Sequence, residues 1–492
     1  MKKTRKFVAA ILAMASLLSV TACGGSGGRT AGGADATEAS TTTAPQTTPV
    51  TYDTDEAVQE AITNIEVDTS LKPEKKLKWM AWWPIDETSA EAELFKANYG
   101  IPEEGDTSYG DYANSISQYI NVAYRERYDK LGNMVAAGDS PDVFPFEIGY
   151  FPLSAYKGMF QSVDGIIDTN APEWADTRDV MDQFMWGGKN YCPITQVNTS
   201  YLFFYRRSVA QDAGLEDPYE LYKAGEWTWD KFLEMADKFQ QSGEGRSICD
   251  GYYVSRSLLC TTGVPLVGIE NGKLKNNMSD PAVESAMALI SKLAEENYRY
   301  DKGSLNSWAP NIKEWGAGNI LFMVDGTWFY EETAQKYMRK FEWGEDDIFF
   351  VPAPRDPNSD KYYQEMKVDP YMLVSGSSNI DTYKAWINCV LAASKDADAK
   401  AAQREKNKRD KYWTDEQLDY LDELTIGGAL TAVFDFRNGI STSCADTTSG
   451  NAPTDIVINH PYNAPENSYT QLRSEHEGEV NAAIEELNSS VA

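Results

Sequence analysis

Short apolar runs alternate with amphipathic helical patterns through most of the chain. Each run is continuous rather than alternating, which is typical of strands buried on both faces. We predict such strands at 78–82, 142–144, 201–205, 320–324, 348–351 and 371–374. Because these strands alternate with helices, the pattern predicts an α/β fold with largely parallel sheets.

The helices between these runs have recognisable starts and stops. Gly138 ends a helix whose apolar stripe begins at Tyr124. Thr228 and Asp280 are suited to cap the N-termini of two later helices. The charged segment 395–423 predicts a solvated helical region near the end of the fold.

The N-terminus has the pattern of an export signal. Basic residues precede an apolar run at 7–20, and small residues then lead to Cys23. This run is too short for a transmembrane helix, which needs roughly 20 apolar residues. We therefore predict a signal peptide over 1–22 and a lipid such as palmitate on Cys23, as in the lipobox of bacterial lipoproteins. Plain secretion after cleavage near Ala22 is the alternative.

A spacer and a large folded part follow the signal. Residues 23–50 are rich in Gly, Thr, Ala and Ser, so they cannot bury a core and predict a flexible linker. The fold is expected to begin between Thr51 and Lys75. About 440 residues remain, which is enough for two lobes.

Charge narrows the class of partner. The formal net charge is −30 at pH 7, and loss of the four basic leader residues makes it −34. Nucleic acid and anionic lipid headgroups require positive charge, so we expect neither as a partner. A neutral or cationic ligand fits this charge, and a gain in solubility alone is the alternative explanation.

The cysteines do not form a known framework. Five cysteines follow Cys23, an odd number at wide spacing, which argues against a disulfide scaffold or a zinc ribbon. Cys249 and Cys260 are near enough in sequence for one bridge, and buried free thiols are the alternative.

Motifs for catalysis or cofactor binding are weak. The two histidines, His460 and His476, form no zinc-hydrolase pattern. Asp356 begins a calcium-loop spacing, but Lys361 replaces the turn glycine and Lys367 replaces the bidentate glutamate. With 75 acidic residues, an acid pair at glycosidase spacing is neither inferred nor excluded. We expect no catalytic residue, no metal and no cofactor.

Aromatic residues carry more information, with 13 Trp, 28 Tyr and 18 Phe in the chain. Trp82, Trp83 and Asp86 directly follow the first predicted strand, and open α/β sheets bind ligands at the carboxyl ends of their strands. Side chains alternate along a strand, so the two tryptophans cannot both point inward. We therefore place this segment at a ligand site.

Four stretches, in order, resemble motifs of one protein family. They are an Ala-Gly-x-x-Pro-Asp-Val turn within 131–143, Gly-Lys-x-Tyr-x-x-Pro and Ala-Gly-Leu segments within 188–215, a Thr-Trp-Asp-x-Phe helix start at 228–232, and a Gly-x-x-x-Met-x-x-x-Gly-x-Trp segment at 318–328. The family is the extracellular solute-binding proteins, family 1, which supplies the sugar receptors of ABC importers and includes maltose-binding protein. The resemblance runs from about Lys75 to Ser375 and is weaker in the C-terminal third.

The resemblance implies a two-lobed, type II periplasmic-binding-protein-like α/β fold, with discontinuous lobes, a hinge and the ligand held between the lobes. Assigned in this way, the first lobe comprises 75–194 plus 321–366 and the second comprises 197–319 plus 370–492. Crossovers between the lobes are expected near 194–198, 320–322 and 366–370. Closure about such hinges is a known motion of binding proteins.

The resemblance also implies which residues bind the ligand. Trp328 corresponds to a tryptophan that forms a platform under a sugar ring, and a core tryptophan at a strand end is the alternative. Phe146, Glu147 and Tyr150 follow the Pro-Asp-Val strand, where the family presents aromatic and polar contacts. Asn198, just past the first crossover, is placed to bind a hydroxyl group.

Some stretches depart from the family pattern. Arg206 and Arg207 stand where the family has Asn and Lys, and the expanded sequence before them weakens the match at 196–199. Phe436 and Arg437 are assigned to the contacts of the second lobe from their clustering alone.

These features predict a monomeric substrate-binding lipoprotein of an ABC importer, anchored to the extracytoplasmic face of the cell membrane. We expect it to bind a carbohydrate, an oligosaccharide in particular, and to deliver it unchanged to the permease subunits. Aromatic rings suit the C–H faces of sugars, and carboxylate, amide and guanidinium groups suit their hydroxyls. A peptide, polyamine or other small solute is an alternative ligand on the same fold. A glycoside hydrolase and an adhesin or sensor lipoprotein are alternative functions.

Overall fold

The computed structural model describes residues 62–63, 65–100, 115–145, 150–199, 201–303, 309–425, 428–444 and 452–491. The chain divides into two units, Met1–Val50 and Thr51–Ala492, and every element below belongs to the second unit. The predicted signal peptide, Cys23, Phe146 and Glu147 lie outside the described residues.

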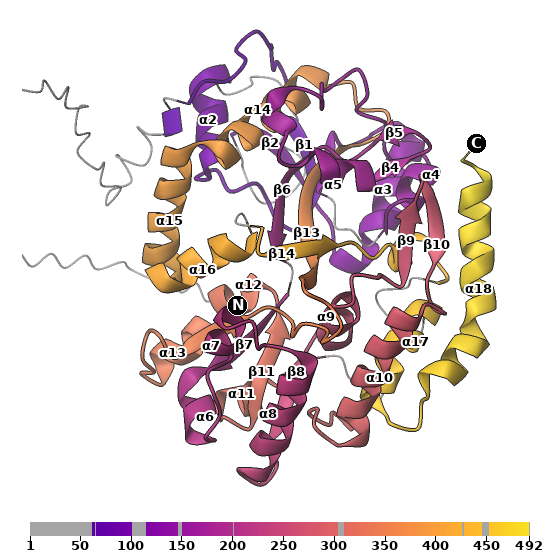
Figure 1. Cartoon of the computed structure of the whole chain (residues 1–492). Coiled ribbons are helices and arrows are strands. Elements are labelled where there is room, and N and C mark those ends of the chain that lie inside the picture. Colours follow the sequence, from indigo (N-terminus) through magenta and orange to yellow (C-terminus); the bar gives the residue numbers. More distant parts are fainter. Residues whose placement is uncertain are drawn as a thin grey trace, which may run out of the picture. The chain divides into compact units, whose positions relative to one another are not determined.

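The first sheet contains β1 (Leu77–Ala81), β2 (Ser117–Asn121), β3 (Val143–Pro145), β6 (Ile194–Thr199), β13 (Tyr362–Leu373) and β14 (Leu430–Val433). Its order is β14-β13-β3-β1-β2, with β6 also paired to β13 (Figure 1). β1 is parallel to β2 and β3, whereas β13 is antiparallel to β3. Trp79 of β1 packs this sheet against α14 (Ile380–Lys395), because its ring contacts Trp386 of that helix at 6.1 Å between centroids.

The second sheet has the order β12-β7-β11-β8 and consists of β7 (Leu202–Arg206), β8 (Ser247–Gly251), β11 (Ile320–Asp325) and β12 (Ile348–Val351). β11 is parallel to β8, and β7 is antiparallel to both β11 and β12. Phe322 of β11 contacts Phe203 of β7 and Phe232 of α8 (Trp229–Gln241) at 5.8 and 6.0 Å between ring centroids. These buried rings form the core on one face of the sheet.

The remaining elements are short hairpins and helices around the two sheets. The hairpins are β4 (Met185–Trp186) with β5 (Lys189–Asn190) and β9 (Val267–Glu270) with β10 (Lys273–Asn276). The helices are α2 (Ala90–Tyr99), η1 (Tyr124–Glu126), α3 (Arg127–Ala137), α4 (Leu153–Tyr156), η3 (Pro172–Trp174), α5 (Arg178–Gln183), α6 (Arg207–Asp212), α7 (Pro218–Lys223), α9 (Val254–Cys260), α10 (Pro281–Glu295), α11 (Ile312–Gly316), α12 (Thr327–Phe329), η4 (Tyr330–Ala334), α13 (Gln335–Lys340), α15 (Ala397–Lys411), α16 (Asp415–Thr425), η5 (Arg437–Gly439), α17 (Pro453–Asn463) and α18 (Tyr469–Ser489).

Strand β13 extends well beyond the carboxyl end of β3. Its last residues pair with β3, with Leu373 opposite Val143 and Tyr371 opposite Pro145. Since the two strands are antiparallel, the earlier residues of β13 continue past the carboxyl end of β3. β14 and β6 pair with this extension, and β6 leads directly to β7 of the second sheet.

Strand pairing differs from the predicted lobe assignment in two places. The range 321–366 was assigned to the first lobe, but β11 and β12 within it pair with β7 in the second sheet. The segment 320–322 begins β11, which pairs with β7 on one edge and with β8 on the other. The range 370–492 was assigned to the second lobe, but α14 within it packs against α2 and β6. The predicted mainly parallel pairing holds for β1, β2 and β3 but not around β7.

The predicted helix ends agree with the structure. Gly138 ends α3 in a left-handed conformation, with φ of 74°. The Thr228 side chain caps α8 by accepting a hydrogen bond from the Lys231 N–H at 3.4 Å. Asp280 caps α10 in the same way, accepting from the Ala282 N–H at 2.9 Å. These caps depend on residues within one turn of each other, which is why the sequence pattern located them.

The five cysteines in the described residues are free and buried, so Cys249 and Cys260 form no bridge. Burial raises the pKa of the Cys249 thiol to about 12. Within the described part of the chain, no helix is both long and apolar enough to cross a lipid bilayer.

Candidate functional site

One aromatic cluster lies at an edge of the second sheet. We call it the Trp328 cluster, and it consists of Tyr201, Tyr252, Tyr253 and Trp328. β8 and β11 are parallel, so the residues that follow them, Tyr252 and Trp328 among them, lie at the same edge. Tyr201 joins them because it precedes β7, which is antiparallel to β11. This is the carboxyl edge, where open α/β sheets bind ligands.

The rings of the Trp328 cluster have a defined packing. Tyr201 and Tyr253 are stacked, with centroids 3.7 Å apart and an interplanar angle of 15°. Trp328 meets both rings at nearly right angles, at 6.3 Å from Tyr201 and 6.0 Å from Tyr253. Edge-to-face and stacked pairs are the preferred aromatic arrangements. The cluster therefore presents a rigid aromatic surface.

Gly326 and Trp328, the Gly-x-Trp of the 318–328 segment, are in direct contact. A Cβ atom at position 326 would come within 1.8 Å of the Trp328 ring, so the indole lies directly against the glycine backbone. Trp328 nevertheless remains 38% exposed, which distinguishes it from a core tryptophan. An exposed indole fixed against the backbone is suited to act as a platform for a ligand.

A buried carboxyl group lies beside this platform. Asp325 ends β11, is 2% exposed, and accepts a hydrogen bond from the Gly326 N–H at 2.8 Å. Burial raises the pKa of Asp325 to about 7. Asp250 on the neighbouring strand forms an ion pair with Lys302 at 2.9 Å. Asp325 was not among the residues predicted from the sequence, since an aspartate at a strand end is more often exposed.

A second aromatic cluster lies at the carboxyl edge of the first sheet. We call it the Trp82 cluster, and it consists of Trp82, Trp83, Tyr124, Arg127 and Tyr128. The Trp82 ring meets Trp83 at 4.4 Å and Tyr124 at 5.0 Å, both edge to face. Trp83 is 41% exposed, which agrees with the prediction that one of the two tryptophans faces outward.

Arg127 is the centre of the Trp82 cluster. Its guanidinium carbon lies 3.8 Å from the ring centroid of Tyr124, 4.4 Å from that of Tyr128 and 5.7 Å from that of Trp82. The arginine is buried, and desolvation strengthens such cation–π contacts. Arg127 was not among the residues predicted from the sequence, although the spacing of Tyr124 and Arg127 places them on one helix face.

The other predicted contact residues have different surroundings. Tyr150 is buried and stacks on Tyr128 of the Trp82 cluster, with ring centroids 3.8 Å apart. Asp86 accepts hydrogen bonds from the backbone N–H and the hydroxyl of Thr88 in a turn. Asn198 donates to the Asp369 carboxylate at 3.0 Å, and this contact joins β6 to β13.

Phe436 and Arg437, predicted from their clustering to contact the ligand, are both buried in this structure. Phe436 packs against Phe184 with ring centroids 5.2 Å apart, and it is buried. Arg437 is also buried and forms an ion pair with Asp435 at 3.0 Å. Their clustering in the sequence reflects packing within the fold.

Strand β13 relates the two clusters in space. Tyr371 lies opposite Pro145 at the carboxyl end of β3, and Glu365 lies six residues earlier on the same strand. At a strand rise of about 3.3 Å per residue, Glu365 is roughly 20 Å beyond the carboxyl end of β3. Gln364, which immediately precedes Glu365, donates a hydrogen bond to the Tyr201 carbonyl. The Trp328 cluster therefore lies beyond the carboxyl edge that carries the Trp82 cluster.

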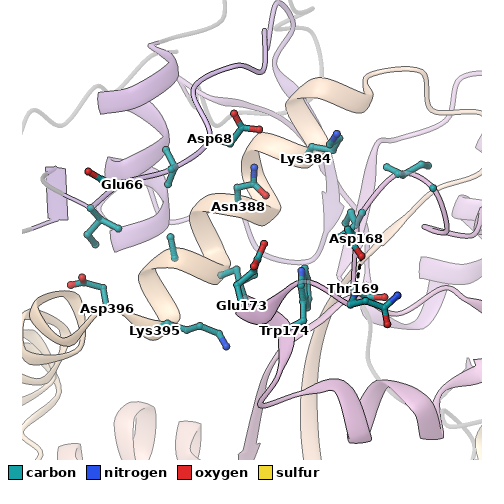
Figure 2. A pocket seen from close by; sticks show the side chains of 18 of the residues that line it. Glu66, Asp68, Asp168, Thr169, Glu173, Trp174, Lys384, Asn388, Lys395 and Asp396 are labelled. Atoms are coloured by element: carbon teal, nitrogen blue, oxygen red, sulfur yellow. Dashed lines mark hydrogen bonds between the residues drawn. The ribbon is translucent and has the colours of Figure 1, made fainter.

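A separate hollow of about 1010 Å³ lies along α14. Its charged lining residues are six acids and two lysines, Glu66, Asp68, Asp164, Asp168, Glu173, Asp396, Lys384 and Lys395. Figure 2 shows Lys384, Asn388 and Lys395 along one helix, with Asp68 on one side and Glu173 on the other. None of its lining residues belongs to either aromatic cluster. Among the described residues, no group of three or more His, Cys, Asp or Glu could hold a metal ion.

Sequence comparison identifies one family. A family model described as bacterial extracellular solute-binding protein matches residues 113–404. A search of curated proteins finds no significant match.

Several solved structures are similar to this chain. The GacH receptor of Streptomyces glaucescens, solved unliganded and with acarbose, has 16% identity and a TM-score of 0.54, over 82% of this chain and 98% of that one. The cyclic α-maltosyl-1,6-maltose binding protein of Arthrobacter globiformis has 14% identity and a TM-score of 0.58, over 84% and 99%. An ABC transporter associated binding protein of B. animalis subsp. lactis, in complex with β-1,6-galactobiose, has 15% identity and a TM-score of 0.53, over 84% and 98%. At this identity the likeness shows the fold, and it confirms the predicted two-lobed, periplasmic-binding-protein-like α/β architecture.

Proposed function

The chain belongs to the bacterial extracellular solute-binding proteins, and on this premise we propose that it captures a carbohydrate, an oligosaccharide in particular, for an ABC importer. The observation that carries this proposal is the exposed Trp328 indole, which rests against Gly326 and is flanked by Tyr201 and Tyr253. A flat apolar face held in one orientation matches the C–H face of a pyranose ring and loses little entropy on binding.

The Trp82 cluster supplies the second surface in this proposal. Trp83 is exposed beside Trp82 at the carboxyl edge of the first sheet. A ligand held between the two clusters would contact the exposed rings of Trp83 and Trp328, and closure about β6 and β13 would bring the clusters closer together. Several linked sugar rings fill the space between two clusters better than a single ring, which favours an oligosaccharide.

Binding without turnover follows from the same chemistry. Aromatic stacking and hydrogen bonds to hydroxyl groups retain a sugar without any reacting group. The ligand would then reach the permease subunits unchanged. Attachment through Cys23 to the extracytoplasmic face of the membrane and a monomeric state complete the proposal, and they rest on the sequence pattern.

A polyamine or another organic cation is the second candidate ligand. Aromatic rings also bind cations, and Asp325 places a carboxyl group next to the rings of the Trp328 cluster. The net charge of −30 for the whole chain would attract such a ligand.

Thermal unfolding of the mature chain with a ligand panel tests the proposal. The panel contains monosaccharides, oligosaccharides, peptides and polyamines. A ligand present at 100 times its dissociation constant adds about 2.7 kcal/mol to the free energy of unfolding if it binds only the folded state. Stabilisation by an oligosaccharide that is recovered intact supports the proposal. Stabilisation by polyamines or peptides alone rejects the carbohydrate, and hydrolysis of the oligosaccharide identifies an enzyme.

A further inference from the structure

A buried ion pair is in contact with the Trp328 cluster through Tyr201. Arg256 on α9 donates from its Nε and Nη2 atoms to both carboxylate oxygens of Glu365 on β13. The Glu365 side chain is 1% exposed and the Arg256 side chain is 14% exposed. A bidentate arginine–carboxylate pair fixes the orientation of both side chains.

Arg256 also contacts the cluster itself. Its guanidinium carbon lies 5.5 Å from the ring centroid of Tyr201. Tyr253 stacks on the same Tyr201 ring and lies three residues before Arg256, at the start of α9. Residues at this spacing share one helix face, so a single turn of α9 supplies both contacts to Tyr201.

Strand β13 holds Tyr201 by a second route. Gln364 donates from its Nε2 atom to the Tyr201 carbonyl, and its Oε1 atom accepts from the Ala353 N–H at 3.1 Å. Gln364 and Glu365 are adjacent and both buried, so they act on opposite faces of the strand. One holds the main chain of Tyr201, and the other acts on its ring through Arg256.

The energetics of the pair favour a positioning role over a stabilising one. Burial raises the pKa of the Glu365 carboxyl, and the Arg256 charge opposes this shift. Two buried charges of this kind often contribute little net stability relative to apolar residues, because desolvation offsets their attraction. What the pair provides is a fixed geometry for the groups around it.

We propose that Arg256 and Glu365 are positioning residues for ligand binding, which hold the Tyr201 ring, and through it the Tyr253 and Trp328 rings, in the geometry that receives the ligand. The expected effect on ligand affinity rests on the proposed function. The effect on the orientation of the Tyr201 ring does not depend on any ligand. Because β13 also pairs with β3, the strand that orients this platform is continuous with the first sheet.

The first variant replaces the pair with apolar residues, Arg256→Met with Glu365→Leu. Both charges leave together, so no unpaired charge is buried. The matched control is Arg206→Met with Asp347→Leu. That pair is also largely buried, with a distance of 2.9 Å, and Arg206 lies 3.7 Å from the ring centroid of Trp343, outside both aromatic clusters.

Two readouts separate positioning from folding. The first is the ¹⁹F NMR signal of 3-fluorotyrosine at position 201 in the ligand-free mature chain. We expect the signal to shift and broaden in the Arg256/Glu365 variant and to remain unchanged in the control. The second is calorimetric titration with maltotriose and with β-1,6-galactobiose. We expect at least a tenfold loss of affinity in the variant and less than a twofold loss in the control.

An unchanged ¹⁹F signal in a folded Arg256/Glu365 variant would overturn the inference. If the double variant does not fold, Arg256→Lys provides the test, because lysine keeps the charge but loses the planar fork. The same shift of the ¹⁹F signal is expected there. Failure of both sugars to bind the unmodified protein would count against the proposed function, while the ¹⁹F signal would still decide the positioning role.

Discussion

The indole of Trp328 lies so close to Gly326 that any side chain at position 326 would occupy the same space. Replacement of Gly326 by alanine would place a methyl group within 1.8 Å of the ring in the present geometry, and backbone and ring cannot both stay in place. The glycine is therefore required by contact with the ring, since its backbone φ is −76° and needs no left-handed conformation.

Gly326→Ala is expected to displace Trp328 and to weaken ligand binding by at least tenfold. The measurement is a titration of whichever panel ligand stabilises the unmodified protein, followed by tryptophan fluorescence. Gly344→Ala is the control, because a Cβ there meets no atom within 4 Å. Equal affinities for the Gly326 variant and the control would show that Trp328 is not the platform.

Trp83→Ala and Trp328→Ala are each expected to reduce affinity, with losses that add in the double variant. Each ring loses its contact with the ligand, which we expect to cost about 1–3 kcal/mol of binding free energy. The two tryptophans belong to clusters on different sheets that share no residue, and effects at sites without shared partners are usually independent. Isothermal titration of the three variants measures both values.

Phe341→Ala is the control for these two variants. Phe341 is 51% exposed but belongs to neither aromatic cluster. It should leave affinity unchanged. A loss for Trp328→Ala with none for Trp83→Ala would restrict the site to the second sheet.

Asp325 is expected to make stability depend on pH. Its pKa is raised from 3.8 to about 7 in the folded state, so the folded protein binds the proton more tightly than the unfolded chain. The resulting stabilisation is complete below about pH 4 and is lost as pH rises towards 7. The loss amounts to roughly 4 kcal/mol at most, from 1.36 kcal/mol per unit of pKa.

Asp325→Asn removes this titration and is expected to raise the free energy of unfolding at pH 8 but not at pH 4. Urea unfolding across this range measures the difference between the two proteins. Parallel stability curves for the variant and the unmodified protein would show that Asp325 does not titrate in this way.

Asp280→Ala is expected to lower the free energy of unfolding by about 1 kcal/mol. The Asp280 carboxylate caps α10 through the Ala282 N–H, and alanine cannot accept that hydrogen bond. Chemical denaturation of the mature chain gives the value. Ligand affinity should stay constant, because α10 supplies no residue to either cluster.

The local features of this fold were predictable from sequence because they depend on neighbours in the chain. The caps at Thr228 and Asp280 and the stop at Gly138 involve residues within one helical turn. The buried strand at 320–324 was recognisable from its apolar run, although its place in the second sheet was not. That place depends on Phe204 of β7, which pairs with Met323.

The candidate site was predictable only in part for the same reason. Trp82, Trp83 and Trp328 stood out because aromatic residues directly follow strands or a known motif. Tyr252 and Tyr253 satisfy the same rule, but the strand before them, Ser-Ile-Cys-Asp-Gly, is too polar to recognise from its pattern.

The helix caps, most buried strands, the family and the tryptophans of the two clusters could all be inferred from the amino-acid sequence. These signals lie within short segments, where periodicity and hydrogen bonding to near neighbours act. The tertiary structure alone decided how the rings are arranged and supported. Tyr201 and Gln364 are 163 positions apart, yet a hydrogen bond joins them. Such contacts depend on how strands from distant parts of the chain pair, which no local pattern encodes.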